Sequence, residues 1–317
     1  MNYDDYYLRA CNVCTNNDYT KLAFSEQVFK TDHRSALFQC NHCGMTPYFA
    51  TYQLDNRKLL EEEYYLPDGK GEYTARSATE NAYKKVVREN LKWAQSILNL
   101  PEKSKLLDVG CGEGILLEEA TKIGFDCDGI EPSHDQCAKH QKNGLKAHQG
   151  LLEDYQNQFK NQFDVITLSW VFDHFMNPKE SIEIIHQMLK QQGYVIMMQS
   201  TMLDVPLFRY KYAIAIPHQK AFSGILPNKT TAFSHPYYYT KQSLNNLLVS
   251  VGFEYYAEKS NQGLKPVFIF KKASSSAKST QHHIDFKPLN KTFYLWYLRD
   301  RFYTPVFKML FKLLKKD

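Results

Sequence analysis

The sequence predicts an α/β protein with a mostly parallel central sheet, a small cysteine-rich module before it and a basic tail after it. Two observations predict the sheet. Between residues 105 and 270, short apolar runs alternate with amphipathic segments that end at glycines, and a glycine-rich turn follows the first apolar run. The module is predicted by two Cys-x-x-Cys pairs within the first 45 residues.

Composition limits the protein class. A chain of 317 residues can hold one large domain or a medium domain with a small satellite, and 23% charged with 43% hydrophobic residues is typical of soluble globular proteins. The sequence contains no apolar run long enough to span a bilayer, and its first residues lack the basic and apolar regions of a signal peptide. We therefore expect a cytoplasmic protein.

Four cysteines in the segment 1–50 predict a zinc-ribbon-like module. They form two pairs separated by twenty-five residues: Cys11, Cys14, Cys40 and Cys43. Each pair would place two thiolates on a tight turn, and four thiolates close a tetrahedral shell, so the expected Zn²⁺ is structural. Residues 21–24 and 36–39 alternate as short strands do. The alternatives are two redox-active or incidental pairs, or a ligand role for His33 or His42.

The segment 51–100 is expected to be a tyrosine-rich connector followed by one helix. The apolar residues of this helix recur at helical spacing: Tyr83, Val87, Leu91, Ala94 and Leu98. The main domain is expected over residues 101–272. Its predicted strands cover 105–109, 125–130, 163–168 and 194–199, and its predicted helices cover 114–123, 134–143, Pro178 to Gly193 and 241–251, before a final hairpin of 253–258 and 266–270.

The glycine-rich turn lies in LLDVGCGEG, residues 106–114, at a strand end where ligands of such sheets bind. It is not a phosphate loop, because no Gly-Lys-Ser/Thr follows, and its glycine spacing differs from the dinucleotide fingerprint. Asp108 and Glu113 give the turn a negative character. This character suits a ligand with an ammonium and a sulfonium group better than one with a pyrophosphate.

Together with GIEPS at residues 129–133 and FDVITLSWVFDHFMNP at residues 163–178, this stretch resembles class I S-adenosylmethionine-dependent methyltransferases. The resemblance covers roughly residues 105–270. It implies a Rossmann-like seven-stranded sheet and an enzyme that uses S-adenosyl-L-methionine as its cofactor.

The resemblance also implies roles for single residues. The three glycines of the turn would line the methionine part of the cofactor, Glu131 would bind both ribose hydroxyls, and Ser169 and Trp170 would face the sulfonium. The expected cofactor-binding residues are Asp108, Gly110, Gly112, Gly114, Glu131, Leu152, Glu153, Ser169, Trp170 and Arg76.

Two parts of this set are less direct. Leu151, Leu152 and Glu153 would border the adenine, although many relatives carry an Asp in place of Leu151, so the adenine contact can fall to backbone amides or to Glu153. Arg76 would bind the cofactor carboxylate unless it is a surface arginine.

Two histidines are candidates for the general base that takes the proton of an acceptor hydroxyl. His174 follows the strand predicted over 163–168, and His235 precedes the helix predicted over 241–251, at a position where relatives often have a substrate-facing histidine. In the alternative, His174 orients a loop and His235 packs among tyrosines. Asp173 is expected to orient a neighbour.

Residues 201–235 are expected to form a substrate lid. The segment combines aromatic and basic residues with a single acid, Asp204: Phe208, Arg209, Tyr210, Lys211, Tyr212, Lys220, Phe222, Lys229 and Phe233. Such a lid would stack a sugar or a base and attract a phosphate. The alternative is an ordinary mobile loop with solvated lysines.

Residues 273–290 are expected to form a linker, and residues 291–317 form a tail with seven Lys or Arg against two Asp, which accounts for the net charge of +5. After Pro305 the apolar and basic residues fall on opposite helix faces, a pattern typical of helices that lie on anionic lipid. We expect peripheral contact with the inner face of the cytoplasmic membrane; the alternative is docking on the body or on a partner. The first 290 residues carry a net charge of zero, which argues against nucleic acid as a partner.

The whole arrangement of ribbon, connector and domain resembles a group encoded among bacterial cell-surface polysaccharide and secondary-metabolite sugar genes, which includes sugar C-methyltransferases. It implies methyl transfer to a sugar nucleotide or lipid-linked glycan, for which we expect O-methylation. The alternatives are a methyltransferase directed at RNA or protein, and a degenerate scaffold without activity. The intact Asp108, Gly110, Gly112 and Glu131 favour an enzyme.

Overall fold

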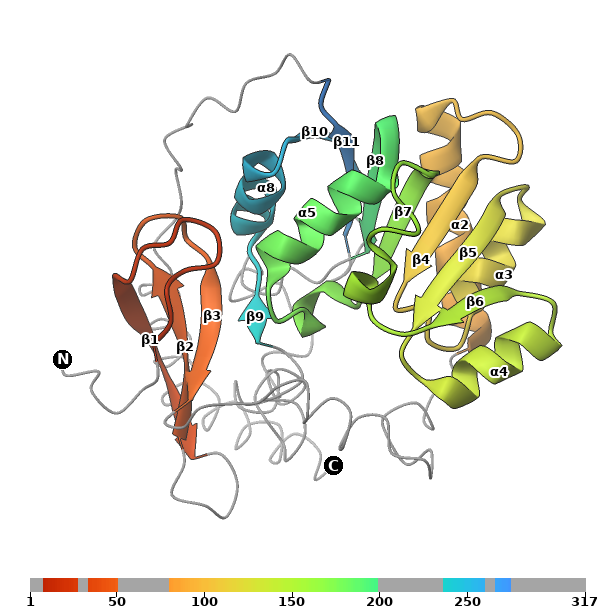
Figure 1. The fold of residues 1–317 in the computed structure, drawn as a ribbon. Coiled ribbons are helices and arrows are strands. Elements are labelled where there is room, and N and C mark those ends of the chain that lie inside the picture. The colour runs from red at the N-terminus through yellow and green to blue at the C-terminus, as the bar shows by residue number, and fades with distance from the viewer. Residues whose placement is uncertain (1–7, 28–33, 51–79, 199–235, 260–265, 275–317) are drawn as a thin grey trace, which may run out of the picture. The chain divides into compact units, whose positions relative to one another are not determined.

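The structure is a computed structural model that describes residues 8–27, 34–50, 80–198, 236–259 and 266–274 (Figure 1). The chain divides into two compact units. One unit contains residues 60–200 and 245–282, and the other contains residues 1–59, 201–244 and 283–317. The predicted lid and the predicted basic tail lie outside the described residues, so both stay predictions.

One unit is built on a seven-stranded sheet with the order β10-β11-β8-β7-β4-β5-β6 (Figure 1). Its strands are β4 (Lys105–Val109), β5 (Asp126–Glu131), β6 (Lys146–Gln149), β7 (Phe163–Ser169), β8 (Leu189–Met198), β10 (Phe253–Lys259) and β11 (Val267–Lys272). Neighbours from β6 to β8 run parallel, whereas β11 is antiparallel to β8 and to β10. The predicted Rossmann-like sheet with a terminal hairpin is confirmed.

The described helices are α2 (Glu80–Leu98), α3 (Ile115–Lys122), α4 (His134–Lys142), η3 (Leu152–Tyr155), η4 (Phe172–His174), α5 (Pro178–Met188) and α8 (Lys241–Ser250). None of them is long and apolar enough to cross a membrane.

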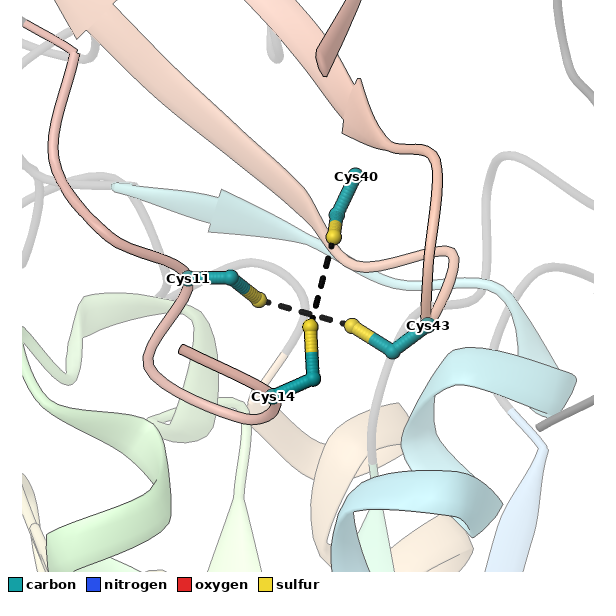
Figure 2. A group of neighbouring side chains, drawn as sticks. All are labelled: Cys11, Cys14, Cys40 and Cys43. Atoms are coloured by element: carbon teal, nitrogen blue, oxygen red, sulfur yellow. Dashed lines mark hydrogen bonds between the residues drawn. The ribbon is translucent and has the colours of Figure 1, made fainter. Parts of the chain in front are cut away.

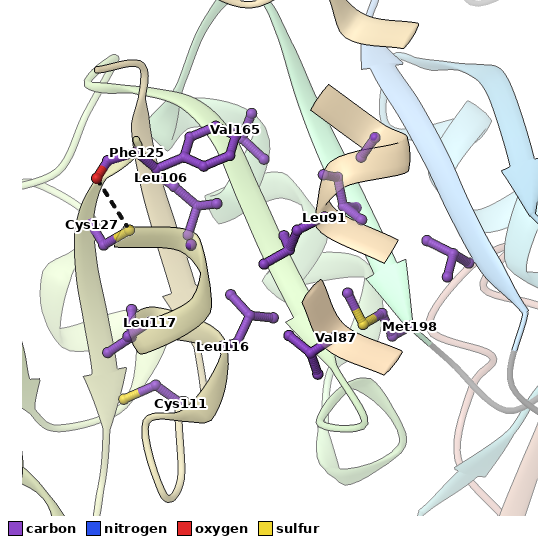
Figure 3. Close-up of a cluster of buried hydrophobic side chains, with 14 of the residues drawn as sticks. Val87, Leu91, Leu106, Cys111, Leu116, Leu117, Phe125, Cys127, Val165 and Met198 are labelled. Atoms are coloured by element: carbon purple, nitrogen blue, oxygen red, sulfur yellow. Dashed lines mark hydrogen bonds between the residues drawn. The ribbon is translucent and has the colours of Figure 1, made fainter. Parts of the chain in front are cut away.

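The core beneath α2 and α3 explains why the predicted helical spacing forms a helix (Figure 3). Val87 and Leu91 of α2 are fully buried in one cluster with Leu116 of α3 and with Leu106 and Val165 of the sheet. Burying each aliphatic side chain contributes about 1.5–3 kcal/mol, so one apolar stripe is enough to hold α2 on the sheet.

The helix that begins at Pro178 is shorter than predicted. It is followed at once by β8, which begins at Leu189, so the prediction that Gly193 closes this helix is wrong. Gly193 lies within β8 beside Gln192 (φ 62°), where the register between β7 and β8 shifts. A Cβ at Gly193 would lie 3.0 Å from the carbonyl oxygen of Lys190. Glycine therefore serves a close backbone approach in an irregular strand, and not a helix stop.

A buried lysine completes the C-terminal end of α5. Lys272 of β11 is 8% exposed, and its Nζ donates to the carbonyl oxygens of His186 and Leu189 at 2.6 and 2.8 Å. Carbonyls at a helix C-terminus have no intrahelical donor, and a cation there also complements the helix dipole. Burial lowers the pKa of the Lys272 ammonium below its ordinary value.

The other unit contains a four-stranded antiparallel sheet with the order β1-β2-β3-β9. Its strands are β1 (Tyr19–Gln27), β2 (Arg34–Cys40), β3 (Thr46–Ala50) and β9 (Tyr237–Tyr238). The two strands predicted from alternation are present and longer than predicted, whereas β3 and β9 were not predicted. In β9, Tyr238 pairs with Thr46 and Tyr237 pairs with Pro47. The chain directly after the predicted lid is therefore part of the same sheet as the cysteine module.

Two residues separate β9 from α8, which begins with a reciprocal cap. The Thr240 N–H donates to Ser243 Oγ at 3.0 Å, and the Ser243 N–H donates to Thr240 Oγ1 at 2.9 Å. This exchange satisfies two amides at the helix start, in the manner of a capping box. The helix predicted over residues 241–251 is confirmed.

Candidate functional site

The glycine-rich turn connects β4 to α3 at the carboxyl end of the sheet. Gly110, Gly112 and Gly114 all adopt positive φ angles, 68°, 50° and 75°, which side chains disfavour. Space is also limiting: a Cβ at Gly110 would lie 2.5 Å from Val171 Cγ2, and one at Gly114 would lie 2.6 Å from His140 Cε1. The turn therefore requires glycine for two reasons: the backbone angles are positive, and at Gly110 and Gly114 neighbouring side chains leave no space for a Cβ atom.

Hydrogen bonds tie this turn to the end of β5. The N–H groups of Gly110 and Cys111 donate to the carbonyl oxygen of Ile130 at 2.8 and 3.1 Å, and the Gly112 N–H donates to Glu131 Oε2 at 2.8 Å. The turn is closed by the Gly114 N–H, which donates to the Cys111 carbonyl oxygen at 2.8 Å. The sequence motif thus forms a backbone cradle that is closed by its own hydrogen bonds.

Glu131, the last residue of β5, is 2% exposed. Its Oε1 accepts the Ser133 N–H at 3.0 Å, and its Oε2 accepts the Gly112 N–H. Burial raises the pKa of Glu131, and these two N–H groups oppose the rise. A carboxylate has about four acceptor sites, so each oxygen can accept one more hydrogen bond. Two adjacent acceptors at a strand end match the two hydroxyls of a ribose.

Asp108 is buried in β4, directly before Val109, the last residue of the strand. Its Oδ1 accepts a hydrogen bond from the hydroxyl of Thr167 on β7 at 2.7 Å. Burial raises the pKa of Asp108 to about 7, and the charge of Glu131 adds to the rise. A cationic ligand nearby would favour the ionised form. The negative character predicted for the turn therefore depends on pH close to neutrality.

Ser169 is the last residue of β7 and Trp170 follows it, and the structure brings Tyr83 of α2 to both of them. The Tyr83 hydroxyl lies 3.3 Å from Ser169 Oγ, and its ring centroid lies 4.9 Å from that of Trp170. Trp170 has a φ of 54°, which is strained for a bulky side chain. Such strain persists where the surroundings fix the residue, and it is concentrated at functional sites.

His174 ends η4, four residues after Trp170, and its side chain is 20% exposed. Its Nε2 lies 4.0 Å from Asp173 Oδ1, so the acid neighbours the imidazole, and the orienting role of Asp173 stays a prediction. Val171, which packs against Gly110, connects this segment to the glycine turn. Ser169 and Trp170 therefore lie at the same edge of the parallel sheet as Glu131, and the short helix that ends at His174 follows them.

The predicted adenine side lies after β6. Leu152 begins η3 and is buried, whereas Glu153 is exposed. The N–H of Leu151 donates to Asp154 Oδ2 at 2.8 Å, so Asp154 is the carboxylate that contacts the backbone here. Arg76 and His235 lie outside the described residues, and their assignments stay predictions.

Sequence reasoning missed several of these contacts. Tyr83 was assigned only to a helix face, and Thr167 lies in the middle of an apolar strand. His140 of α4 is 1% exposed, and its Nε2 lies 2.6 Å from the carbonyl oxygen of Gly112. The available signal was its position three residues after Cys137, which places both side chains on the buried face of a polar helix.

The second candidate site is the cysteine cluster (Figure 2). Its four sulfur atoms all lie within 4.8 Å of one another, with Cys11 Sγ 3.4 Å from Cys43 Sγ and Cys14 Sγ 3.5 Å from Cys40 Sγ. Tetrahedral Zn–S bonds of about 2.3 Å place sulfurs roughly 3.8 Å apart, so a small adjustment accommodates the ion. His42, the described alternative ligand, is exposed. The donor set fits Zn²⁺ and leaves no open coordination position.

Comparisons with known proteins identify a family for the larger part of the chain. A family model described as a methyltransferase domain matches residues 77–258, more than half of the chain. A ubiquinone biosynthesis O-methyltransferase of Pseudomonas syringae pv. tomato is 31% identical over 147 residues, which cover 44% of this chain and 61% of that protein. The mitochondrial ubiquinone biosynthesis O-methyltransferase of Bos taurus is 26% identical over 159 residues, which cover 47% of this chain and 40% of that protein.

Among solved structures, a 1,6-didemethyltoxoflavin-N1-methyltransferase of Burkholderia thailandensis superposes with a TM-score of 0.49 at 13% identity, covering 80% of this chain and 100% of that one. The matches to the curated relatives extend over only part of the length of those proteins.

Proposed function

Because the chain belongs to the methyltransferase-domain family, we propose that it transfers a methyl group from S-adenosyl-L-methionine to a hydroxyl of a sugar or glycan. The family supports the transferase activity and the cofactor. The observation that carries the placement of the cofactor is the buried Glu131 carboxylate, whose two oxygens are each fixed by one backbone N–H at a strand end. The names of the matched curated relatives support an oxygen acceptor.

In this proposal the cofactor is held by described residues and by Arg76, which lies outside the described part of the chain. Glu131 accepts the ribose hydroxyls, the glycine turn lets the methionine part approach the backbone, and ionised Asp108 attracts the cationic end. Leu152 borders the adenine, Ser169 and Trp170 border the methyl-bearing side, and Arg76 takes the carboxylate. The cofactor supplies an electrophilic methyl group on a sulfonium sulfur.

The protein's own contribution to the reaction is alignment and proton removal. An acceptor oxygen must lie in line with the methyl group, about 3 Å away, and must lose its proton as the new bond forms. We assign the base role to His174, with Asp173 stabilising the imidazolium across 4.0 Å. His235 is the second candidate for the same role.

Two acceptor classes compete. The aromatic and basic composition of residues 201–235, and the resemblance to enzymes of sugar gene clusters, support a sugar nucleotide or lipid-linked glycan. The curated relatives are named for ubiquinone biosynthesis, which supports a phenolic hydroxyl on an isoprenoid as the second candidate. An RNA or protein acceptor has no comparable support.

The test begins with calorimetry of S-adenosylhomocysteine against the wild-type protein and the Glu131→Ala variant. We expect binding that the variant loses; no binding by the wild type would favour a scaffold instead. Formation of S-adenosylhomocysteine is then followed with nucleotide sugars, lipid-linked glycans, polyprenyl catechols and RNA as acceptors. Turnover with a catechol, and none with any sugar, would replace the proposed acceptor by the phenolic one.

We further propose that residues 291–317 hold the enzyme on the inner face of the cytoplasmic membrane. Seven basic residues beside an aromatic-rich face support this location. The full chain should float with vesicles that contain anionic lipid and should not float with neutral vesicles. A chain that ends at residue 290 should remain in solution with both, and equal flotation of the two chains would reject the proposal.

A further inference from the structure

We infer that His140 is a positioning residue that sets the glycine turn before the cofactor binds, an inference that rests on the proposed placement of the cofactor against this turn. His140 lies on α4, outside the three sequence motifs, and is 1% exposed. Its Nε2 lies 2.6 Å from the carbonyl oxygen of Gly112. Since a carbonyl oxygen only accepts hydrogen bonds, Nε2 carries the hydrogen and donates it.

The hydrogen bond from His140 is one of a series that holds consecutive peptide groups of the glycine turn. Ile130 accepts from Gly110 and Cys111, and Glu131 accepts the N–H of Gly112. The carbonyl of Gly112 belongs to the next peptide group along the chain, and this is the group that His140 fixes. In a trans peptide the carbonyl and the following N–H point in opposite directions, so His140 also fixes the direction of the next N–H.

The imidazole ring also fills the space beside the last glycine of the turn. A Cβ at Gly114 would lie 2.6 Å from His140 Cε1 and 2.8 Å from Nδ1. The ring therefore reaches the turn at two points, through a hydrogen bond at Gly112 and through packing at Gly114. A turn held at both points has lost most of its conformational freedom before binding, so the ligand does not bear that entropy cost.

Three substitutions separate the hydrogen bond from the volume of the ring. His140→Gln can place an amide N–H near the position of Nε2, whereas the amide of His140→Asn is too short to reach Gly112. His140→Met fills space without a donor. The matched control is Gln141→Met on the same helix, because Gln141 Nε2 also donates to a backbone carbonyl, that of Ala147 at 3.2 Å, away from the turn.

Two measurements are made on the full chain: S-adenosylhomocysteine affinity by calorimetry, and amide hydrogen exchange of peptides that cover residues 110–114. For His140→Met and His140→Asn we expect binding about 3- to 10-fold weaker, the effect of one lost hydrogen bond. Exchange of the turn should be faster than in wild type without ligand and equal to it when the ligand saturates. His140→Gln should restore affinity, and Gln141→Met should keep it.

The outcomes distinguish this inference from the proposed function. If the wild-type protein binds and His140→Met binds equally well with unchanged exchange, the positioning role is wrong. If Gln141→Met weakens binding as much as His140→Met, the effect is one of general stability and the role is also wrong. If the wild-type protein itself does not bind S-adenosylhomocysteine, the proposed function fails first.

Discussion

Tyr238 lies opposite Thr46 in an antiparallel strand pair, although 192 residues separate them along the chain. The Thr46 hydroxyl donates to the Tyr238 carbonyl oxygen, and Tyr237 is buried beside it at 5% exposure. Thr46 follows Cys43 by three residues, so the turn that carries two of the cysteines leads directly into the strand on which β9 forms. We expect metal binding to stabilise this pairing and the chain that enters α8.

Loss of the metal should therefore loosen residues far from the cysteines in sequence. We expect the wild-type chain to contain zinc, and the Cys40→Ser/Cys43→Ser double variant to lack it and to show faster amide exchange over residues 236–240. Structural zinc contributes of order 10 kcal/mol to the folding of small modules, so the module should unfold. Elemental analysis measures the zinc content, and hydrogen-exchange mass spectrometry measures the amide exchange. Cys127→Ala is the control, which should keep its zinc. Slow exchange over residues 236–240 in the zinc-free variant would contradict this coupling.

Cofactor affinity should fall as the pH falls below about 7, because burial raises the pKa of Asp108 to about 7. Below that pH the carboxyl is protonated and no longer attracts a cation, so the affinity contributed by its charge declines by up to tenfold per pH unit. The folding stability of the ligand-free protein depends on pH in the opposite direction. A raised pKa means that the carboxyl contributes most to stability at acid pH, and that this contribution is lost as the pH rises through 7.

Calorimetry of S-adenosylhomocysteine between pH 6 and pH 8.5 measures the first effect, and buffers of different ionisation enthalpy reveal the proton released on binding. In Asp108→Asn the dependence should flatten. If the variant keeps the wild-type slope, the titrating group is another one, and Glu131, whose pKa burial also raises, is the next candidate.

The sequence predicted the central sheet well because its signals are local. The buried strands β7 and β11 are largely apolar runs, and each glycine of the turn adopts a positive φ. The position of Glu131 at the end of β5 was predicted from the same local pattern, whereas its role in binding a ribose comes from the resemblance and stays a prediction.

The failures have two causes: contact between segments distant in sequence, and local patterns that are weak or ambiguous. A two-residue strand such as β9 has no periodicity, and its partner is known only from the fold. The polar edge strand β6 lacks an apolar run, and Gly193 marks a strand irregularity that resembles a helix stop in sequence. His140 was missed because its partner is a backbone carbonyl 28 residues away.

Replacing Lys272 should lower the free energy of unfolding of the unit with the seven-stranded sheet by about 1.5–3 kcal/mol. Two carbonyl oxygens at the end of α5 would lose their buried, charged hydrogen-bond donor. Lys272→Met keeps the length of the side chain and removes the charge. The neighbouring Lys271→Met is the control: Lys271 Nζ lies 5.8 Å from the ring centroid of Tyr194, a weaker contact for which we expect less than about 1 kcal/mol. Urea denaturation compares the two, and equal losses would contradict the capping role.

The pair of helices α2 and α3 should show a pH-dependent stability that comes from Glu119. Its carboxylate has no exposed surface and binds Arg88 of α2 and, at 2.9 Å, Lys122 Nζ. The Arg88 guanidinium, together with Lys122, holds the pKa of Glu119 below its ordinary value. A carboxylate whose pKa is lowered by folding contributes stability that is present above its ordinary pKa. This stability is lost as the pH falls through the lowered pKa.

Glu119→Gln should therefore cost about 1–2 kcal/mol at pH 7, and the difference from wild type should shrink towards pH 3. Urea denaturation at both pH values measures it. Glu118→Gln is the matched control, because its side chain is 32% exposed and its lysine partners lie 3.8 and 3.9 Å away, so it should change little at either pH. A constant difference for Glu119→Gln at both pH values would show that lost packing, and not the lost charge, causes the destabilisation.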